Sequence, residues 1–397
     1  MPLPRFSHRA LTPLTNLIVH PNSLSIKGVP TTAFVCIQLR TLSGKSKDPC
    51  AKKEEKRGGK EDNEALKSFQ ECLYKSNNEQ KIHSGRKVSI VGTGAVGMAC
   101  AIAILAKGVT NRMSFFDVNE KWCNAERMDL MHGSLLLNNA QINACSTPQV
   151  TEKSRVIVVT AGARPKKNET RLDVAQKTAD IMKNIMPELV KHSPNAVFII
   201  VSNPADVMAW VAQKVSKLPY ERCFSAGCHL DSLRFRYFIA QRLKVSPRSV
   251  HGYVIGEHGG SSVPLWSTLT VGGIQLHAVL PSIGTKDDPL QWGKVHEDVV
   301  KAAFDVIAVK GYTNWAIGLS VADIVSAIFE NSNRIISLST NVQGICDIKD
   351  EVYLSLPCRV SRWGLAGIMR LKLSKWEKKM LKKSVAALVE AQNGIKL

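Results

Sequence analysis

The chain has 397 residues, a formal net charge of +20 and 44% hydrophobic residues. This length suits two domains with an additional segment rather than a single compact core. The charge alone would allow nucleic acid, an anionic membrane surface or small acidic molecules as partners. No aromatic-and-basic motif for nucleic acid is present, and a Gly-Thr-Gly turn interrupts the uncharged stretch from Val88 to Ala106 that could otherwise suggest a spanning helix. We therefore expect a soluble protein that binds neither nucleic acid nor membrane.

The first part of the chain, residues 1–63, is predicted to be a basic extension and linker outside the main fold. Residues 1–47 contain six Lys or Arg residues and no acidic residue. An acid-poor start with Arg and Ser resembles a mitochondrial transit peptide. Four prolines within the first 21 residues interrupt any long amphipathic helix, so a disordered tail is an equal alternative. Residues 64–85 follow as an N-terminal arm, which includes a short amphipathic helix over 64–75.

From Lys87 onward, short apolar strands alternate with helical patterns. The strands are expected at Val88–Val91, Met113–Phe116, Val156–Thr160 and Val197–Val201. Such alternation is typical of a parallel sheet covered by helices on both faces. From about Ser246 the pattern changes to mixed strands and long helices, and the last helix is expected over Trp376–Gln392. We therefore predict an α/β fold, with a Rossmann-type doubly wound parallel sheet over residues 86–245 and a second, mixed α+β domain over residues 246–397.

A glycine-rich turn follows the first predicted strand. It reads Gly92-Thr-Gly94-Ala-Val-Gly97, it opens a predicted helix, and Asp117 stands at the end of the next strand. This context is the dinucleotide-binding fingerprint: Gly92 permits a tight turn, Gly94 lets the backbone approach a pyrophosphate, and Gly97 lets the helix pack closely on the strand. The helix N-terminus offers free N–H groups to phosphates. Asp117 would accept hydrogen bonds from ribose hydroxyls and repel a 2′-phosphate, which favours NAD over NADP.

Three ionisable residues are candidates for proton transfer and carboxylate binding. His258 stands in the turn Gly256-Glu-His-Gly259, and histidine exchanges protons near neutral pH. Asp231 and Arg234 share a face if their segment is helical. Asp231 could orient a histidine ring and stabilise its charge, and Arg234 could bind a carboxylate through two hydrogen bonds. For each residue taken alone, an explanation without function is commoner: an exposed histidine in a turn for His258, and a surface ion pair for Asp231 and Arg234.

Three further candidates follow the ends of predicted strands or helices. Arg171 ends the polar loop 164–171, which comes soon after the strand ending at Thr160, and Asn203 follows another strand directly. Loops at the carboxyl ends of parallel strands carry the binding site in doubly wound sheets, and a mobile loop could bring Arg171 over a substrate. The alternatives are a solvated charged loop and a turn-forming Asn before Pro. Thr313 by itself does not indicate a function.

Taken together, these motifs resemble the lactate/malate dehydrogenase family. In chain order they are Gly92-Thr-Gly-Ala-Val-Gly97, Thr160-Ala-Gly-Ala-Arg164, Glu169-Thr-Arg171, Val201-Ser-Asn-Pro204, Leu230-Asp-Ser-Leu-Arg-Phe-Arg236, Gly256-Glu-His-Gly259 and Lys310-Gly-Tyr-Thr313. The stretch Trp315–Asp323 looks specifically like the animal L-lactate dehydrogenases of that family. The resemblance covers about residues 64–397, and the motifs are jointly specific.

The resemblance implies a catalytic role for four residues. His258 is expected to be the proton donor and acceptor, with Asp231 as its partner. Arg234 is expected to clamp the substrate carboxylate, and Arg171 to polarise the carbonyl from a lid over the site. The implied reaction is reversible hydride transfer between NADH and pyruvate, as in glycolytic pyruvate metabolism.

The resemblance also implies the other substrate and cofactor contacts, the oligomeric state and the cellular compartment. Asn203 and Thr313 are expected in the substrate pocket, Asn203 also near the cofactor, and Arg164 along the cofactor phosphates. The partners implied are a small 2-keto or 2-hydroxy acid and further subunits in a homo- or hetero-tetramer, with no metal. The family's usual compartment is the cytoplasm, and the basic extension leaves import into mitochondria open.

Three departures from the family pattern bear on activity and substrate choice. Pro165 stands where the family has the Gln or Arg that helps choose the substrate, Asn168 where a lid glycine is usual, and Gly260 where an acid normally follows the catalytic turn. None of them removes a catalytic group. They leave open an enzyme for another 2-keto acid, and a nucleotide-binding subunit that has lost activity.

Overall fold

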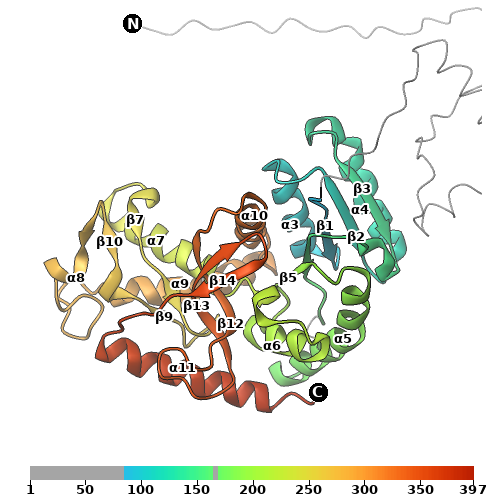
Figure 1. Cartoon of the computed structure of the whole chain (residues 1–397). Coiled ribbons are helices and arrows are strands. Elements are labelled where there is room, and N and C mark those ends of the chain that lie inside the picture. Colours follow the sequence, from blue (N-terminus) through green and yellow to red (C-terminus); the bar gives the residue numbers. More distant parts are fainter. Residues whose placement is uncertain (1–84, 164–168) are drawn as a thin grey trace, which may run out of the picture. The chain divides into compact units, whose positions relative to one another are not determined.

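The computed structural model describes residues 85–163 and 169–397 (Figure 1). The predicted amphipathic helix over 64–75 and the residues Arg164, Pro165 and Asn168 lie outside these ranges. The first half of the described chain alternates between strands and helices. Its elements are β1 (Val88–Val91), α3 (Ala95–Ala106), β2 (Arg112–Phe116), α4 (Glu120–His132), β3 (Gln141–Cys145), β4 (Val156–Val159), α5 (Arg171–His192), β5 (Val197–Ile200), α6 (Ala205–Ser216) and β6 (Cys223–Ser225).

The second half contains longer helices and short antiparallel strands. Its elements are α7 (His229–Leu243), β7 (Val250–His251), β8 (Val254–Ile255), β9 (Val263–Pro264), β10 (Thr270–Val271), β11 (Ile274–Gln275), α8 (Leu276–Val279), α9 (Gly293–Lys310), α10 (Trp315–Glu330), β12 (Ile335–Asn341), β13 (Tyr353–Ser361), β14 (Gly364–Ile368) and α11 (Lys375–Asn393). No helix within the two described ranges is long and apolar enough to cross a membrane.

The main sheet has nine strands in the order β14-β13-β12-β6-β5-β4-β1-β2-β3. The six strands from β3 to β6 are all parallel. Their order, 3-2-1-4-5-6, is that of a Rossmann sheet, in which the direction of winding reverses between β1 and β4. The predicted doubly wound α/β fold is therefore confirmed. Ligands bind such sheets outside the carboxyl ends of the strands near this reversal.

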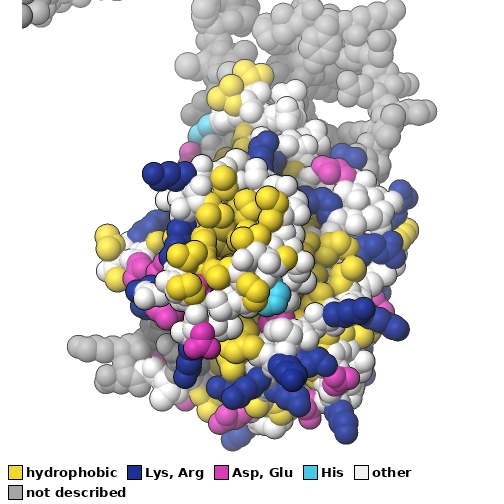
Figure 2. All heavy atoms as spheres, turned by 90° about the vertical axis from the view of Figure 1, so that its left-hand side faces the viewer, with side chains coloured by type: hydrophobic (Ala, Val, Ile, Leu, Met, Phe, Trp, Pro, Cys, Tyr) yellow, Lys and Arg dark blue, Asp and Glu magenta, His cyan; other side chains and the backbone are white. Residues whose placement is uncertain are grey.

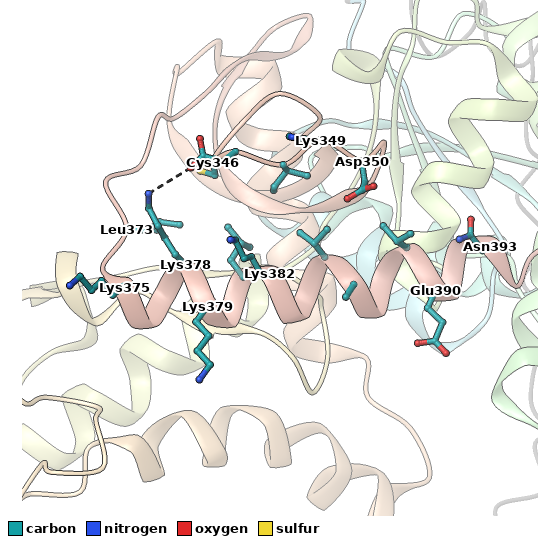
Figure 3. Close-up of a pocket in the computed structure, with 16 residues that line it drawn as sticks. Cys346, Lys349, Asp350, Leu373, Lys375, Lys378, Lys379, Lys382, Glu390 and Asn393 are labelled. Carbon is teal, nitrogen blue, oxygen red and sulfur yellow. Dashed lines mark ion pairs between the residues drawn. The ribbon is translucent and has the colours of Figure 1, made fainter.

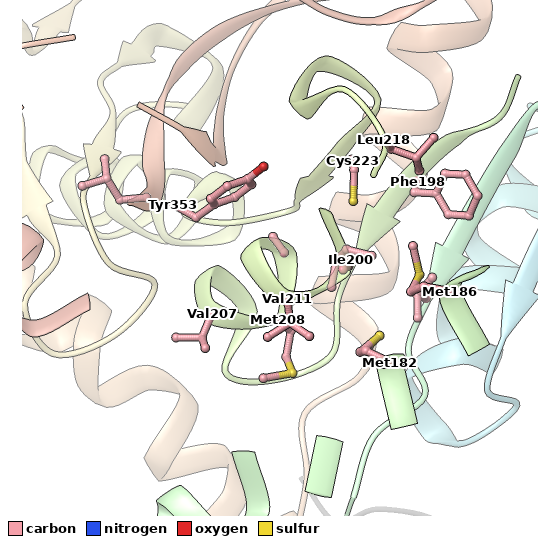
Figure 4. Close-up of a cluster of buried hydrophobic side chains, with 14 of the residues drawn as sticks. Met182, Met186, Phe198, Ile200, Val207, Met208, Val211, Leu218, Cys223 and Tyr353 are labelled. Atoms are coloured by element: carbon pink, nitrogen blue, oxygen red, sulfur yellow. The ribbon is translucent and has the colours of Figure 1, made fainter. Parts of the chain in front are cut away.

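The parallel strands are buried on both faces because their residues alternate between two cores. In β5, Phe198 and Ile200 belong to a core that also contains residues of α5 and α6, whereas Val197 and Ile199 belong to a second core with residues of α3 and α10. Figure 4 shows part of the first core, in which Met182 and Met186 of α5 lie near Phe198. Full burial of one such side chain contributes roughly 1.5–3 kcal/mol to folding. The continuous apolar strands in the sequence reflect this two-sided burial.

Three strands from the second half of the chain extend the same sheet. Strand β12 is antiparallel to β6, with Ser339 opposite Ser225, and β13 and β14 follow it outward. A separate core lies beneath α7 and α9 and includes Phe235, Trp266 and Trp292. The predicted boundary between domains near residue 246 stays a prediction, since the sheet itself runs through both halves.

The described surface carries exposed apolar side chains on the second half of the chain. Figure 2 shows a group of hydrophobic side chains on the face that carries α8 and the short sheet of β7 and β10. Ile274 and Val279 are among the exposed residues of this part, and Val309 and Trp315 are exposed at the adjoining ends of α9 and α10. Exposed apolar groups of this kind commonly mark contacts with other chains.

Candidate functional site

The glycine turn after β1 brings helix α3 very close to the strand. Gly92 has φ +92°, a conformation that favours glycine. A Cβ added to Gly97 would lie 1.9 Å from the carbonyl oxygen of Gly92. The α3 helix begins directly after Gly94, so its first N–H groups have no partners within the helix and face the carboxyl end of β1. This narrow turn at a helix N-terminus fits the pyrophosphate of a dinucleotide.

Asp117, the acidic residue predicted to bind ribose, is held against this turn. Its Oδ2 accepts hydrogen bonds from the backbone N–H of Thr93 at 2.7 Å and from the Thr93 hydroxyl at 3.1 Å, and its Oδ1 accepts one from Asn119 N–H at 2.9 Å. Trp122 of α4 donates from its indole N–H to the Thr93 carbonyl oxygen at 2.9 Å. Thr93 and Trp122 were not predicted from the sequence, because neither residue type marks a cofactor site.

The three ionisable candidates lie together. The Nδ1 of His258 is 2.6 Å from Oδ2 of Asp231, and Nη1 of Arg234 donates to Oδ1 of the same carboxylate at 3.1 Å. The side chains of His258, Arg234 and Asp231 are 27%, 16% and 9% exposed. Asp231 therefore bridges the other two and occupies the Nδ1 side of the imidazole. The Nε2 atom is left as the position from which His258 can exchange a proton.

The charges of this group favour a protonated histidine. The Asp231 carboxylate raises the pKa of His258 to about 9, against the lowering effect of burial. Burial would raise the pKa of Asp231, but the charges and hydrogen bonds of His258 and Arg234 outweigh it and lower that pKa. At neutral pH the group is therefore an imidazolium and a guanidinium on one carboxylate. This arrangement can donate a proton and attract an anion.

Two other helices hold the backbone of the histidine turn. The N–H of His258 donates to Oδ2 of Asp206, in the first turn of α6, at 2.7 Å. The N–H of Glu257 donates to the hydroxyl of Ser384, on α11, at 2.7 Å. The sequence analysis did not identify Asp206 or Ser384. An acid in the first turn of a helix is common for electrostatic reasons, so Asp206 carried no distinguishing signal.

The far side of the same turn is closed by its own residues and by α9. Oε2 of Glu257 accepts a hydrogen bond from Ser261 N–H at 3.0 Å, and the Ser262 hydroxyl lies 3.0 Å from Nε2 of His296. A Cβ added to Gly260 would meet nothing within 4 Å. The acid that the family usually has at position 260 could thus fit, but Glu257 already supplies a carboxylate to this turn. The turn is therefore held by several hydrogen bonds even though position 260 carries no acid.

Of the remaining predicted residues, Asn203 directly follows β5, Arg171 begins α5, and Thr313 lies between α9 and α10. Asn203 is exposed just beyond β5, three residues before Asp206. Arg171 is the first residue of α5, whose start is fixed by a capping box between Thr170 and Asp173. Its side chain, like the whole of Arg164, lies outside the described part of the structure. Thr313 is half-buried between α9 and α10.

Helix α10 begins just after Thr313 and packs on α3, the helix that follows the glycine turn. A Cβ added to Gly318 would lie 2.5 Å from the carbonyl oxygen of Ala99, so α10 packs directly on α3. Thr313 stands two residues before the start of α10 at Trp315. The structure thus brings its segment toward the helix that opens at the glycine turn.

One described pocket lies away from this site. A pocket of about 970 Å³ separates the loop 346–350 from α11, with Lys375, Lys378 and Lys382 on its rim and Lys378 paired to Asp347 at 3.7 Å (Figure 3). None of the predicted site residues lines it. Among the described residues, no group of three or more His, Cys, Asp or Glu side chains is placed to hold a metal ion. The chemistry of the described site therefore lies in the His258 group and the glycine turn.

Comparisons with known proteins match this arrangement over nearly the whole described chain. Residues 86–225 match the family model of the lactate/malate dehydrogenase NAD binding domain, and residues 228–396 match that of the family's alpha/beta C-terminal domain. The L-lactate dehydrogenase C chain of Sus scrofa is 44% identical over 330 residues, which are 83% of this chain and 99% of that protein.

Two further relatives are similarly close. The L-lactate dehydrogenase B chain of Sceloporus undulatus is 46% identical over 310 residues, or 78% of this chain and 92% of that protein. The B chain of Homo sapiens is 44% identical over 318 residues, or 80% of this chain and 95% of that protein. The predicted resemblance is confirmed, and the chain belongs to the lactate/malate dehydrogenase family.

Proposed function

We propose that the protein is an NAD-dependent L-lactate dehydrogenase that interconverts L-lactate and pyruvate. The observation that carries this proposal is the position of Asp231, which bridges the imidazole of His258 and the guanidinium of Arg234. The reaction needs one group that exchanges a proton with the substrate oxygen and one cation that binds the substrate carboxylate. The relatives with 43–46% identity are L-lactate dehydrogenases, which supports the same activity here.

Each residue has a defined part in the proposed reaction. Bound NADH would supply the hydride to the keto carbon. The Nε2–H of His258 would give its proton to the carbonyl oxygen, and the Asp231 carboxylate would stabilise the imidazolium before that transfer. Arg234 would hold the carboxylate through its remaining N–H groups, and Arg171 would polarise the carbonyl. In the reverse direction neutral His258 would accept the hydroxyl proton of lactate.

The cofactor would be held by the residues of the first predicted motif. Gly92, Gly94 and Gly97 would leave room for the pyrophosphate at the start of α3, and Asp117 would accept hydrogen bonds from the ribose. Arg164 would run along the phosphates. Asn203 would lie beside the cofactor and the substrate, and Thr313 would complete the substrate pocket. The close contact between Gly97 and Gly92 is the observation that supports this binding mode.

Substitution of Arg234 by Lys tests the carboxylate clamp. Lysine keeps the charge but has no fork with which to bind Asp231 and the substrate together. Because hydrogen bonds to charged groups contribute about 1.5–3 kcal/mol, the KM for pyruvate should rise roughly 10- to 100-fold, with a smaller change in kcat. The measurement is steady-state NADH oxidation, with Arg248→Lys, an exposed position, as the control. Unchanged pyruvate kinetics would show that Arg234 does not bind the carboxylate.

A comparison of substrates tests the function as a whole. Purified protein would be assayed for NADH oxidation with pyruvate, 2-ketobutyrate, a branched keto acid and oxaloacetate. Fast turnover of pyruvate would support the proposal and show that Pro165 is tolerated. Preference for a bulkier keto acid would favour the second candidate, a dehydrogenase of another 2-hydroxy acid, since Pro165 stands where the family selects its substrate. No turnover together with clear NADH binding would indicate a subunit that has kept only its cofactor site.

The protein is further proposed to form tetramers in the cytoplasm. The exposed apolar side chains, among them Val309 and Trp315, support contacts with other subunits. Sedimentation equilibrium should give the mass of four chains. The basic first 47 residues keep mitochondrial import as the alternative compartment. A fluorescent reporter fused to residues 1–60 distinguishes the two, because a diffuse cytosolic signal would rule out import.

A further inference from the structure

A second carboxylate lies against the backbone of the catalytic histidine. Oδ2 of Asp206 accepts a hydrogen bond from the backbone N–H of His258 at 2.7 Å. Asp206 is 2% exposed, and within the described part of the chain its Oδ1 is buried without a hydrogen-bond partner. A carboxylate that makes one hydrogen bond and is shielded from water is costly to bury. The nearby positive charge of His258 offsets part of this cost.

The surroundings of Asp206 leave it ionised at neutral pH. Burial raises its pKa to about 6, against the lowering effects of the Ser339 hydroxyl, the His258 N–H and the charge of His258. Glu257 is the other acid that acts on it. Burial raises the pKa of the Cys228 thiol well above its usual value, and the charges of Asp231 and Asp206 raise it further, so the thiol stays protonated. At pH 7 His258 therefore has two carboxylates in contact with it, Asp231 at the ring and Asp206 at the backbone N–H.

Two basic residues near His258, Arg234 and His296, do not raise its pKa. Arg234 lowers the pKa of His258. His296 of α9 is influenced by Asp231, but its own pKa is lowered by burial, so it is neutral at pH 7 and adds no charge. Of the groups that raise the pKa of His258, Asp231 is the first and Asp206 the second carboxylate.

We propose that Asp206 is a positioning residue that supports His258 through both its hydrogen bond and its charge, so that the proton-donating form of the histidine depends on two carboxylates. This inference rests on the proposed function and extends it, because it assigns a separate part to a residue that does not touch the substrate. Asp231 fixes the imidazole ring, and Asp206 fixes the backbone that carries the ring. Both charges stabilise the imidazolium.

Two substitutions separate the two contributions. Asp206→Asn keeps an oxygen that can accept the His258 N–H and removes only the charge. Its amide N–H₂ would take the place of Oδ1, near the buried Ser339 hydroxyl, which also makes no hydrogen bond among the described residues. The variant can therefore satisfy both groups and should fold. Asp206→Ala removes the charge and the acceptor together. Asp305→Asn, an exposed position on α9, controls for the change in net charge.

The protonation of His258 can be measured without turnover. Diethyl pyrocarbonate modifies the neutral imidazole, and peptide mass spectrometry gives the rate at each histidine as a function of pH. We expect the midpoint for His258 to move about 1 pH unit lower in Asp206→Asn than in the unchanged protein, since a nearby opposite charge favours the charged form by at least this much. Asp231→Asn should give the larger shift, and Asp305→Asn none.

Kinetics provide the second readout. The fall of kcat/KM for pyruvate on the alkaline side should move to lower pH in Asp206→Asn by the same amount, and Asp206→Ala should in addition raise KM because the turn loses its anchor. An unchanged midpoint at His258 in Asp206→Asn, with shifts in Asp231→Asn, would overturn the inference while leaving the dehydrogenase proposal intact. If the unchanged protein does not turn over any keto acid, the proposed function fails, and the modification data still decide whether Asp206 acts on His258.

Discussion

Replacement of His258 by Gln is expected to reduce turnover in both directions by about a thousandfold, because a positioned general acid–base contributes roughly 10²- to 10⁴-fold to the rate. Glutamine can keep a hydrogen bond to Asp231 but cannot exchange a proton. The affinity for NADH, measured by fluorescence titration, should stay unchanged, since the glycine turn lies on different elements. His277→Gln, at an exposed position on α8, is the control.

The unchanged enzyme should also show opposite pH dependences in the two directions. The pKa of His258 is raised to about 9, so the imidazolium required for pyruvate reduction persists through neutral pH and is lost as the pH rises through this value. kcat/KM for pyruvate should therefore fall above about pH 9, whereas kcat/KM for lactate should increase over the same range. In His258→Gln the residual rates should lack this dependence. If His258→Gln retained wild-type turnover, the proton donor would have to be another residue.

Local patterns predicted four of the six parallel strands, whereas β3 (Gln141–Cys145) and β6 (Cys223–Ser225) were not predicted. Val197–Ile200 is continuously apolar, and Val88–Val91 is apolar except for Ser89, because each strand is buried on both faces; the glycine turn marks the start of α3. The addition of β12 to β6 was not predicted. It joins Ser339 to Ser225, and pairing between strands so far apart in sequence leaves no trace in the periodicity of either.

In the candidate site, too, contacts within one segment were easier to predict than contacts between distant segments. The spacing of Asp231 and Arg234 predicted a shared helix face, and the two side chains are 3.1 Å apart. The contact of Asp231 with His258 spans 27 residues. From the residues alone it was a hypothesis beside the commoner surface ion pair, and the resemblance to the family made it the expectation. Asp206 and Ser384 were missed because their function depends on backbone N–H groups of a distant turn. Such acceptors are ordinary residues in sequence and acquire a role only through the packing of α6 and α11.

Gly97→Ala should have the largest effect on the cofactor site. The added Cβ would lie 1.9 Å from the carbonyl oxygen of Gly92, which is backbone and cannot rotate away. Helix α3 cannot retreat freely, because on its other side Ala99 is in close contact with Gly318 of α10. Relief of the overlap therefore requires either a displaced glycine turn or a displaced pair of helices. Overpacking of this kind costs about 1–3 kcal/mol or more.

Two consequences follow from this confinement of α3 between β1 and α10. A displaced turn would misdirect the N–H groups at the helix start, so the affinity for NADH should fall by at least about tenfold, the equivalent of 1.4 kcal/mol. The melting temperature should fall by several degrees, at roughly 2–4 °C per kcal/mol for a domain of this size. Gly367→Ala is the matched control, because its Cβ would meet nothing within 4 Å. Wild-type NADH affinity in Gly97→Ala would mean that the cofactor does not depend on this turn, and the assignment of Gly92, Gly94 and Gly97 would have to be abandoned.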